Sequence, residues 1–380
     1  METAEAIIEE GEPAERLTPP AGINGYNYPS TWINSRERPD RRLRKKLVRR
    51  LSPDRSQILR RLAQCAFAVL NSWVGIEFYL FVRQFEPGGC VVGLSRPAGV
   101  EGWLPIAGLM NLKYALMTGR SPEIHPAAMF LLVAFLLISF LFRKSFCSWL
   151  CPVGSLSEAL WKLGRKMFKR TWALPRWADI PLRGLKYLLL GFFLYAVIGM
   201  SVEVIAAFFS GPYGLVADVK MLNFFRNLGR TSALTIAVLG VLSMMVQNFW
   251  CRYLCPYGAL MGIASLLSPA KIRRNPDRCI DCAKCARACP FLLPVDKLVT
   301  VKSAECTACL ECVAVCPSAG ALDLSFPRKR RISSWVLASC IAAIFVGMVG
   351  CAKLSGGWES RIPTEVYRDL VPIASRLAHP

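Results

Sequence analysis

The stretch CIDCAKCARACP occupies residues 279–290, and CTACLECVAVCP follows it at residues 306–317. Each has the pattern C-x-x-C-x-x-C-x-x-x-C-P, and together they hold eight of the sixteen cysteines in the chain. Zinc sites take four ligands in pairs, whereas this pattern twice places three cysteines close together and one apart. A zinc ribbon or a disulfide knot is therefore disfavoured, and the pattern predicts iron–sulfur clusters.

The spacing is typical of bacterial ferredoxins with two [4Fe–4S] clusters, in which the fourth cysteine of each run binds the other cluster. Two-residue gaps let three thiolates surround one corner of a cubane, but a fourth thiolate so near in sequence cannot reach the remaining iron. Pro290 and Pro317 end the runs and turn the chain away. The predicted ligands are Cys279, Cys282, Cys285 and Cys316 for one cluster, and Cys306, Cys309, Cys312 and Cys289 for the other.

The rest of the composition is that of a membrane protein. Of the 380 residues, 53% are hydrophobic, and the mean hydropathy of +0.35 is high for a soluble domain. The formal net charge of +21 is then interpreted as membrane topology, so no nucleic-acid partner is expected. The acidic start, METAEAIIEEGE, lacks the apolar region of a signal peptide. Reduced cluster thiols indicate a cytoplasmic face.

Apolar runs predict a mainly α-helical membrane protein with about five transmembrane helices, into which an α+β two-cluster ferredoxin module is inserted. A sixth apolar stretch, 99–116, is broken by Gly and Pro and is interpreted as re-entrant or interfacial. With the N-terminus inside, 36 of the 47 Lys and Arg residues fall on cytoplasmic segments, as the positive-inside rule requires. The predicted spans are 62–82, 126–142, 186–209, 233–250 and 333–352.

This topology divides the chain into five parts. A bacterial inner-membrane protein is predicted, with its ferredoxin module in the cytoplasm and its C-terminus in the periplasm. The parts are a basic, largely disordered cytoplasmic arm (1–60), a membrane domain (61–270), the ferredoxin module (271–330), the last transmembrane helix (331–353) and a periplasmic tail (354–380).

A second cysteine motif is repeated within the membrane domain. FCSWLCPVGSLSEAL (146–160) aligns with WCRYLCPYGALMGIA (250–264), and each has the pattern C-x-x-x-C-P-x-G-x-L. Thiols at positions i and i+4 of a helix share one face, so two such pairs at one membrane surface could converge. Three interpretations stay open: a third cluster or another metal, a redox-active thiol set, or a structural role. The four cysteines are Cys147, Cys151, Cys251 and Cys255.

Candidates for quinone binding or proton transfer are the few ionisable residues in apolar surroundings. Glu77 and Glu203 fall in predicted spans, where a carboxylate is costly and therefore a functional candidate. Glu101 and Asp218 fall in two Gly/Pro-interrupted stretches on the outer side, 99–116 and 211–225. Pairing with Lys or Arg at the interface is the alternative for each.

His125 stands at the outer mouth of the second span, where it either starts a helix or takes part in quinone binding or proton release. The chain has only two histidines, which argues against paired histidine ligands to a haem inside the bundle.

The combination of spans, paired C-x-x-x-C-P motifs and a two-cluster module resembles the NapH-type membrane ferredoxins. This family includes the quinol dehydrogenase subunit of periplasmic nitrate reduction, the methylamine-utilisation ferredoxin and the C-terminal half of the regulator NosR. The resemblance covers roughly residues 60–325 and is carried by VEGWLP, HPA, FCSWLCPVG, FWCRYLCPYGAL and the two ferredoxin runs.

The resemblance implies electron transfer between the quinone pool and a redox partner protein, and it implies the cluster ligands assigned above. No large flavin-binding domain precedes the first span, so covalent flavin is not expected. Whether the protein is itself an enzyme, for instance a quinol dehydrogenase subunit, stays open. The alternatives are a maturation factor that reduces a metal such as copper for a respiratory metalloenzyme, or a redox-sensing regulator.

Overall fold

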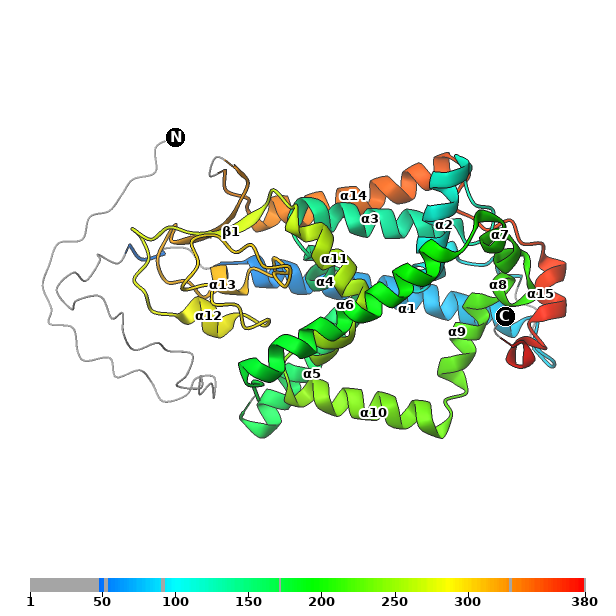
Figure 1. Cartoon of the computed structure of the whole chain (residues 1–380), viewed down its shortest axis with the longest axis horizontal. Coiled ribbons are helices and arrows are strands. Elements are labelled where there is room, and N and C mark those ends of the chain that lie inside the picture. The colour runs from blue at the N-terminus through cyan, green and yellow to red at the C-terminus, as the bar shows by residue number, and fades with distance from the viewer. Residues whose placement is uncertain (1–47, 51–53, 90–92, 171, 328–329, 379–380) are drawn as a thin grey trace, which may run out of the picture.

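The computed structural model describes residues 48–50, 54–89, 93–170, 172–327 and 330–378. Figure 1 shows a long, mostly helical molecule with two different ends joined by a helical bundle. The cysteine-rich end contains β1 (Lys271–Arg274), α12 (Lys284–Ala288) and α13 (Glu311–Ala314). The opposite end, here called the distal end, contains α8 (Pro212–Leu215), α9 (Ala217–Arg226) and α15 (Thr364–Leu370).

Three helices among the described residues are long and apolar enough to cross a bilayer, namely α1 (Ser56–Arg83), α6 (Arg176–Gly199) and α14 (Ser334–Leu354). A fourth span would consist of α9 and α10 (Arg230–Met245), which are bent by 79° at the break between them. The apolar helix α3 (Pro126–Phe142) has 17 residues, the lower limit for a span. The count of five therefore stays a prediction.

Two predicted boundaries are wrong. The third span was expected at 186–209, but α6 ends at Gly199 and α7 (Val202–Ser210) is a separate helix. Ser201 interrupts the apolar run because its hydroxyl caps α7 by accepting from the amide of Val204. The arm was expected to reach residue 60, but α1 begins at Ser56. The remainder of the predicted arm, apart from residues 48–50 and 54–55, lies outside the described residues.

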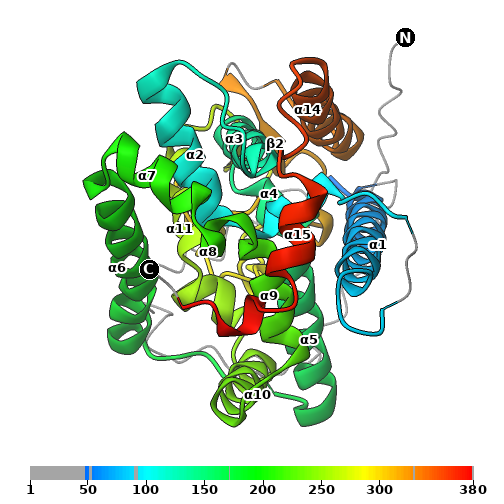
Figure 2. The ribbon, with the colours of Figure 1, turned by 90° about the vertical axis from the view of Figure 1, so that its right-hand side faces the viewer.

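Both interrupted stretches form short helices at the distal end. The stretch 99–116 folds into η2 (Ala98–Trp103) and α2 (Pro105–Thr118), and the stretch 211–225 folds into α8 and most of α9. Figure 2 looks onto this end and shows α8, α9 and α15 in front of the bundle. The C-terminal segment is fixed there, because Lys220 of α9 donates hydrogen bonds to the carbonyls of Ala374 and Leu377.

The two C-x-x-x-C-P motifs share a local fold of a short helix, a break and a longer helix. In each, the second cysteine is the N-cap of the longer helix and the following proline is its first residue. Proline suits that position because its fixed φ is already helical and the first amide has no partner within the helix. The helices are α4 (Ser145–Trp149) and α5 (Pro152–Phe168) in the first motif, and η3 (Trp250–Leu254) and α11 (Pro256–Leu266) in the second.

The ferredoxin module packs directly on the bundle. β1 pairs antiparallel with β2 (Leu322–Ser325), with Lys271 opposite Ser325. One continuous apolar core contains Leu132 and Ile138 of α3, Trp149 of α4 and Leu324 of β2. Contiguous packing of this kind fixes the module relative to the membrane helices, which a flexible tether would not do.

Candidate functional site

The eight ferredoxin cysteines separate into a half-buried and a buried group. The buried four line one cavity, in which Cys289 of the first run joins three cysteines of the second. This is the grouping that the predicted crossed ligation requires. The half-buried four are close enough for their charges to interact. The buried group is Cys289, Cys306, Cys309 and Cys312, and the half-buried group is Cys279, Cys282, Cys285 and Cys316.

The four C-x-x-x-C-P cysteines also line a single pocket, at the junction of the bundle with the ferredoxin module. Burial raises the pKa of Cys151 to about 11, and it also raises the pKa of the Cys147 thiol above its ordinary range. Each of the four interacts electrostatically with others of the set. A buried thiol set of this kind is easily ionised only by bound metal or a nearby cation.

A buried cation is present in this pocket. The Lys144 ammonium is buried, and it has no hydrogen-bond partner among the described residues. Its charge interacts with the thiols of Cys147, Cys251 and Cys255. Its nearest carboxylate, Glu305, lies 3.6 Å away and is shared with Lys186, so positive charge is left over and the pocket fits an anionic group. A cubane held by four thiolates carries net negative charge and therefore fits it.

The backbone of the motif supports the same interpretation. The amide of Gly258, at the start of α11, donates to the Cys255 thiol over 3.2 Å. A Cβ at Gly154, the matching position, would stand 2.2 Å from the Cys147 carbonyl oxygen, so only glycine fits there. No three Cys, His, Asp or Glu side chains in the described segments could hold a single metal ion. A cubane differs because each thiolate binds a separate iron.

The first C-x-x-x-C-P motif is hydrogen-bonded to the loop of the buried cysteine group. The Ser148 hydroxyl donates to the Thr307 carbonyl over 2.6 Å, and the Trp149 indole Nε1 donates to the Ala308 carbonyl over 3.1 Å. The donors lie between Cys147 and Cys151, and the acceptors lie between Cys306 and Cys309. The two cysteine sites therefore share one rigid contact.

The second motif reaches the same module from another direction. Arg252, between Cys251 and Cys255, is buried and pairs with Asp179 of α6 over 2.8 Å. Its charge acts on the thiol of Cys289, opposing the burial that raises the pKa of that thiol to about 11. Each inter-cysteine segment of the membrane motifs thus contacts or faces the buried cysteine group.

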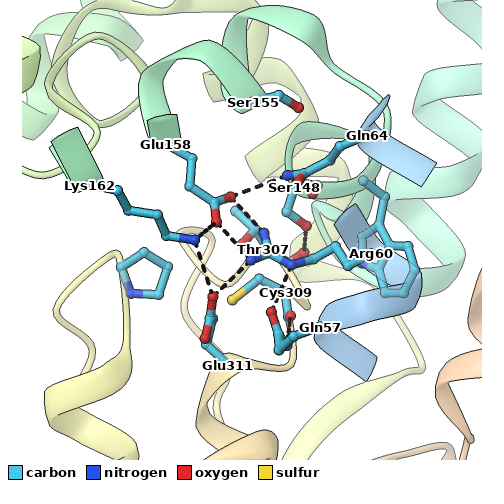
Figure 3. Close-up of polar contacts among 12 residues, drawn as sticks. Gln57, Arg60, Gln64, Ser148, Ser155, Glu158, Lys162, Thr307, Cys309 and Glu311 are labelled. Atoms are coloured by element: carbon cyan, nitrogen blue, oxygen red, sulfur yellow. Dashed lines mark hydrogen bonds and ion pairs between the residues drawn. The ribbon is translucent and has the colours of Figure 1, made fainter. Parts of the chain in front are cut away.

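A buried ion network ties α1, α5 and α13 together beside the same loop. Figure 3 shows the Arg60 guanidinium between two carboxylates, with Arg60 nitrogens 2.6 Å from Glu158 and 2.8 Å from Glu311. Lys162 also pairs with Glu158, and Gln57 donates to the Cys309 carbonyl over 2.9 Å. Burial raises the pKa of the Cys309 thiol to about 12, and the Arg60 charge opposes that rise.

Glu305 carries a second link between module and bundle. Its carboxylate lies 2.5 Å from Lys186 of α6 and 3.6 Å from Lys144. Burial opposes its ionisation, but the two ammonium groups hold the pKa of Glu305 at about 2. Two lysines facing one carboxylate leave a net positive charge between the buried cysteine group and the C-x-x-x-C-P pocket.

At the distal end, three of the five quinone or proton candidates lie together around an arginine that the sequence analysis missed. Arg96 lies 2.7 Å from Glu101 and 2.7 Å from Asp218, and its NH2 group lies 3.1 Å from Nδ1 of His125. The predicted alternative of pairing with Arg thus holds for both carboxylates. His125 is separated from the C-x-x-x-C-P pocket by the length of α3, about 25 Å at 1.5 Å per residue.

The other two candidates lie outside this group. Glu203 is exposed in the first turn of α7, where a carboxylate is favourable next to the helix N-terminus. Glu77 is half-buried on α1. The missed residues, Arg96 and Lys144, are basic. From the sequence alone, Lys and Arg residues were used only to predict which segments face the cytoplasm. Their only signal was proximity in sequence to Glu101 and Cys147.

Models of two iron–sulfur protein families match the segments that contain these motifs. The family model of a 4Fe-4S binding domain matches residues 124–171 and again 230–275, so each match contains one C-x-x-x-C-P motif. The family model of a 4Fe-4S dicluster domain matches residues 271–317. No solved structure matches the chain.

Several known proteins are similar in sequence to large parts of the chain. It is 49% identical to "Putative electron transport protein YccM" of Escherichia coli, over 84% of this chain and 91% of that protein. It is 28% identical to ferredoxin-type protein NapH of Haemophilus influenzae, over 50% of this chain and 67% of NapH. It is 29% identical to regulatory protein NosR of Pseudomonas aeruginosa, over 56% of this chain but 29% of NosR.

Apolar helices, cysteine-lined cavities and these matches define a ferredoxin-type iron–sulfur membrane protein of electron transport. Within that class, the chain belongs to the NapH-type family of membrane ferredoxins.

Proposed function

We propose that the protein passes electrons between the quinone pool and a redox partner protein through three iron–sulfur clusters. The observation that carries this proposal is the direct contact of Ser148 and Trp149 with the Thr307–Ala308 backbone. It brings the cysteine sites of the bundle and of the ferredoxin module next to each other, as a continuous electron path needs. Each cluster would supply a one-electron redox centre.

The exposure of the cysteines supports an order along this path. Two clusters would be held by the half-buried and the buried groups of the module, with the crossed ligands predicted from the sequence. The half-buried group is open to a partner protein, and the loop of the buried group is the one that is hydrogen-bonded to the bundle. The third cluster would be held by the C-x-x-x-C-P cysteines, which are next to apolar helices that a quinone can approach through the bilayer.

The proposed function also includes an orientation in the membrane. The ferredoxin end would face the cytoplasm of a bacterium, and the distal end with the C-terminus would face the periplasm. Support comes from the excess of Lys and Arg on the predicted cytoplasmic segments.

A second candidate function is maturation or regulation, in which the four membrane thiols react directly, for instance in reducing copper. Its support is the match to part of NosR, which is named a regulatory protein. The buried ammonium of Lys144, which shares its nearest carboxylate with Lys186, favours a resident anionic cluster over free thiols in that pocket.

Iron and acid-labile sulfide, measured on anaerobically purified protein, separate these functions. Three cubanes require about 12 iron atoms per chain, and two require about 8. We expect about 12 for the native protein and about 8 when Cys147, Cys151, Cys251 and Cys255 are replaced by serine.

Cys65 and Cys340 supply the matched control, because they belong to neither cysteine motif. The variants Cys65→Ser and Cys340→Ser should leave the iron content unchanged. Anaerobic addition of quinol should then reduce the clusters of the native protein but not those of the quadruple variant. About 8 iron atoms in the native protein, with intact quinol-dependent reduction, would contradict the third cluster.

A further inference from the structure

The distal end holds a buried group of ionisable side chains, here called the distal charge cluster, made of Arg96, Glu101, His125 and Asp218. Four different segments supply them: the loop before η2, η2 itself, the start of α3, and α9. Glu101, His125 and Asp218 are completely buried, and the Arg96 side chain is 9% exposed. Groups of this kind are rarely buried without being paired.

The hydrogen bonds of His125 define its protonation state. Nε2 lies 2.9 Å from the carbonyl oxygen of Gly214, which can only accept, so Nε2 carries a hydrogen. Nδ1 lies 3.1 Å from a nitrogen of Arg96, which can only donate, so this contact is a hydrogen bond when Nδ1 accepts, as it does in the neutral imidazole. The same Nδ1 is also 3.4 Å from a carboxylate oxygen of Glu101.

With a neutral imidazole the distal charge cluster carries one excess negative charge, because one guanidinium faces two carboxylates. An unbalanced buried charge is costly. A proton on Nδ1 of His125 would bring the sum to zero. The hydrogen bond from Arg96 to Nδ1 would then break, and the new Nδ1–H would donate to Glu101. Both states of the imidazole therefore have hydrogen-bond partners.

A tyrosine supplies a second, independent observation. Tyr367 of α15 is 3% exposed, and its hydroxyl has no hydrogen-bond partner within the described part of the chain. It lies within electrostatic range of Arg96, Asp218 and Glu101. A buried hydroxyl without a partner is costly, so this one is suited to a bound water or a moving proton.

The remaining faces of His125 carry no further charge. Asn111 of α2 donates to the His125 carbonyl, and the His125 amide donates to the Ser360 hydroxyl. The Phe209 ring stands edge-on to the imidazole, with the ring centroids 6.2 Å apart. Among the described residues, the charged groups next to the imidazole are therefore Arg96 and Glu101, and Asp218 acts through Arg96.

We propose that the distal charge cluster binds one exchangeable proton and that Nδ1 of His125 is the acceptor. Quinol oxidation releases two protons with its two electrons. The distal charge cluster lies about 25 Å from the cysteine pocket along α3, so it would exchange protons with the solvent at the end opposite the clusters. This use rests on the proposed function, whereas the proton binding itself does not.

The test uses the small number of histidines. The chain has two, so a His379→Gln variant of the full-length protein, with ¹⁵N-labelled histidine, leaves His125 as the single imidazole seen by NMR. We expect Nε2 to stay protonated throughout and Nδ1 to gain a proton as the pH is lowered. A His125 spectrum that does not change with pH, or a proton on Nδ1 at high pH, would overturn the proposal.

Charge-removing variants separate proton binding from a structural role. In Glu101→Gln the charges of the distal charge cluster already sum to zero when the imidazole is neutral. The proton affinity of His125 should therefore fall about tenfold or more. Asp218→Asn should act in the same direction and is the second variant if Glu101→Gln does not fold. The matched control is Glu123→Gln, which changes a carboxylate that is 71% exposed and two residues from His125, and should not shift the titration. An equal titration in all three variants would show that the cluster only braces the distal end.

Quinol-dependent cluster reduction is measured on the same samples. A native titration of His125 with no quinol reaction would remove the proposed function and leave the proton site standing. A quinol reaction with a silent His125 would do the reverse.

Discussion

Lys144 is the residue whose position says most about the pocket between bundle and ferredoxin module. A buried cation favours the more negative, reduced form of a neighbouring redox centre and so raises its potential. Lys144 is buried and acts on three of the four membrane thiols, while its nearest carboxylate, Glu305, is shared with Lys186. Its charge is therefore largely available to whatever those thiols hold.

We predict that Lys144→Gln lowers the midpoint potential of the centre held by the C-x-x-x-C-P cysteines by about 60 mV or more, which is a factor of ten for a one-electron couple. A redox titration followed by electron paramagnetic resonance measures it. Lys144→Arg keeps the charge and should keep most of the potential. Lys284→Gln, at an exposed site on α12, should shift that centre less. A native midpoint in Lys144→Gln with full iron content would contradict the prediction.

The sequence predicted the cysteines, whose spacing is distinctive, and missed Arg96 and Lys144, which belong to no sequence motif. The twelve motif cysteines stand out because thiolate ligation restricts spacing. The pairing of Glu101, His125 and Asp218 depends on contacts between segments far apart in the chain, which no local pattern contains. Arg96 was missed for that reason. The convergence of both cysteine pairs on one pocket was a hypothesis that only the fold could place in space.

At the scale of elements, the junction between α1, α5 and α13 fixes the module on the bundle. The Arg60 side chain is 1% exposed and bridges Glu158 and Glu311, which come from the bundle and the module respectively. Removing one partner from a buried ion network leaves unpaired charge and typically costs about 3–5 kcal/mol. The cost falls on the contact between bundle and module, because Arg60 pairs with one carboxylate from each.

We predict that Arg60→Gln destabilises the attachment of the ferredoxin module by about 3 kcal/mol. Hydrogen exchange in residues 305–316 should become faster, while exchange in α3 should change little. Arg61→Gln changes the neighbouring, exposed position on α1 and serves as the control. Protection of 305–316 that is equal in the two variants would show that apolar packing alone holds the module.

Elements were predicted best where the apolar run was long and uninterrupted, as in α1, α3 and α14. The break between α6 and α7 was missed because Val202–Ser210 is as apolar as a span, and only the Ser201 cap separates it. The bend between α9 and α10 falls at the short connection 227–229, a local signal too weak to fix an angle.

The whole molecule is asymmetric along its length. Cysteine-lined cavities lie at one end, and the distal charge cluster lies at the other (Figure 1). This asymmetry has a functional meaning only if the two ends face different compartments. The ferredoxin module and the C-terminus lie before and after α14, which is long and apolar enough to cross a bilayer. The 17-residue helix α3 also connects the two ends of the molecule.

We therefore predict that the C-terminus and the ferredoxin module face opposite sides of the membrane. Alkaline phosphatase fused after residue 380 should be active, because it folds only outside the cytoplasm, and green fluorescent protein at the same point should be dark. Fusions after residue 270, just before β1, should show the opposite pair of results. Active phosphatase at neither point would mean that α14 does not carry the chain across the membrane. The distal charge cluster would then exchange protons with the same compartment in which the clusters meet their partner.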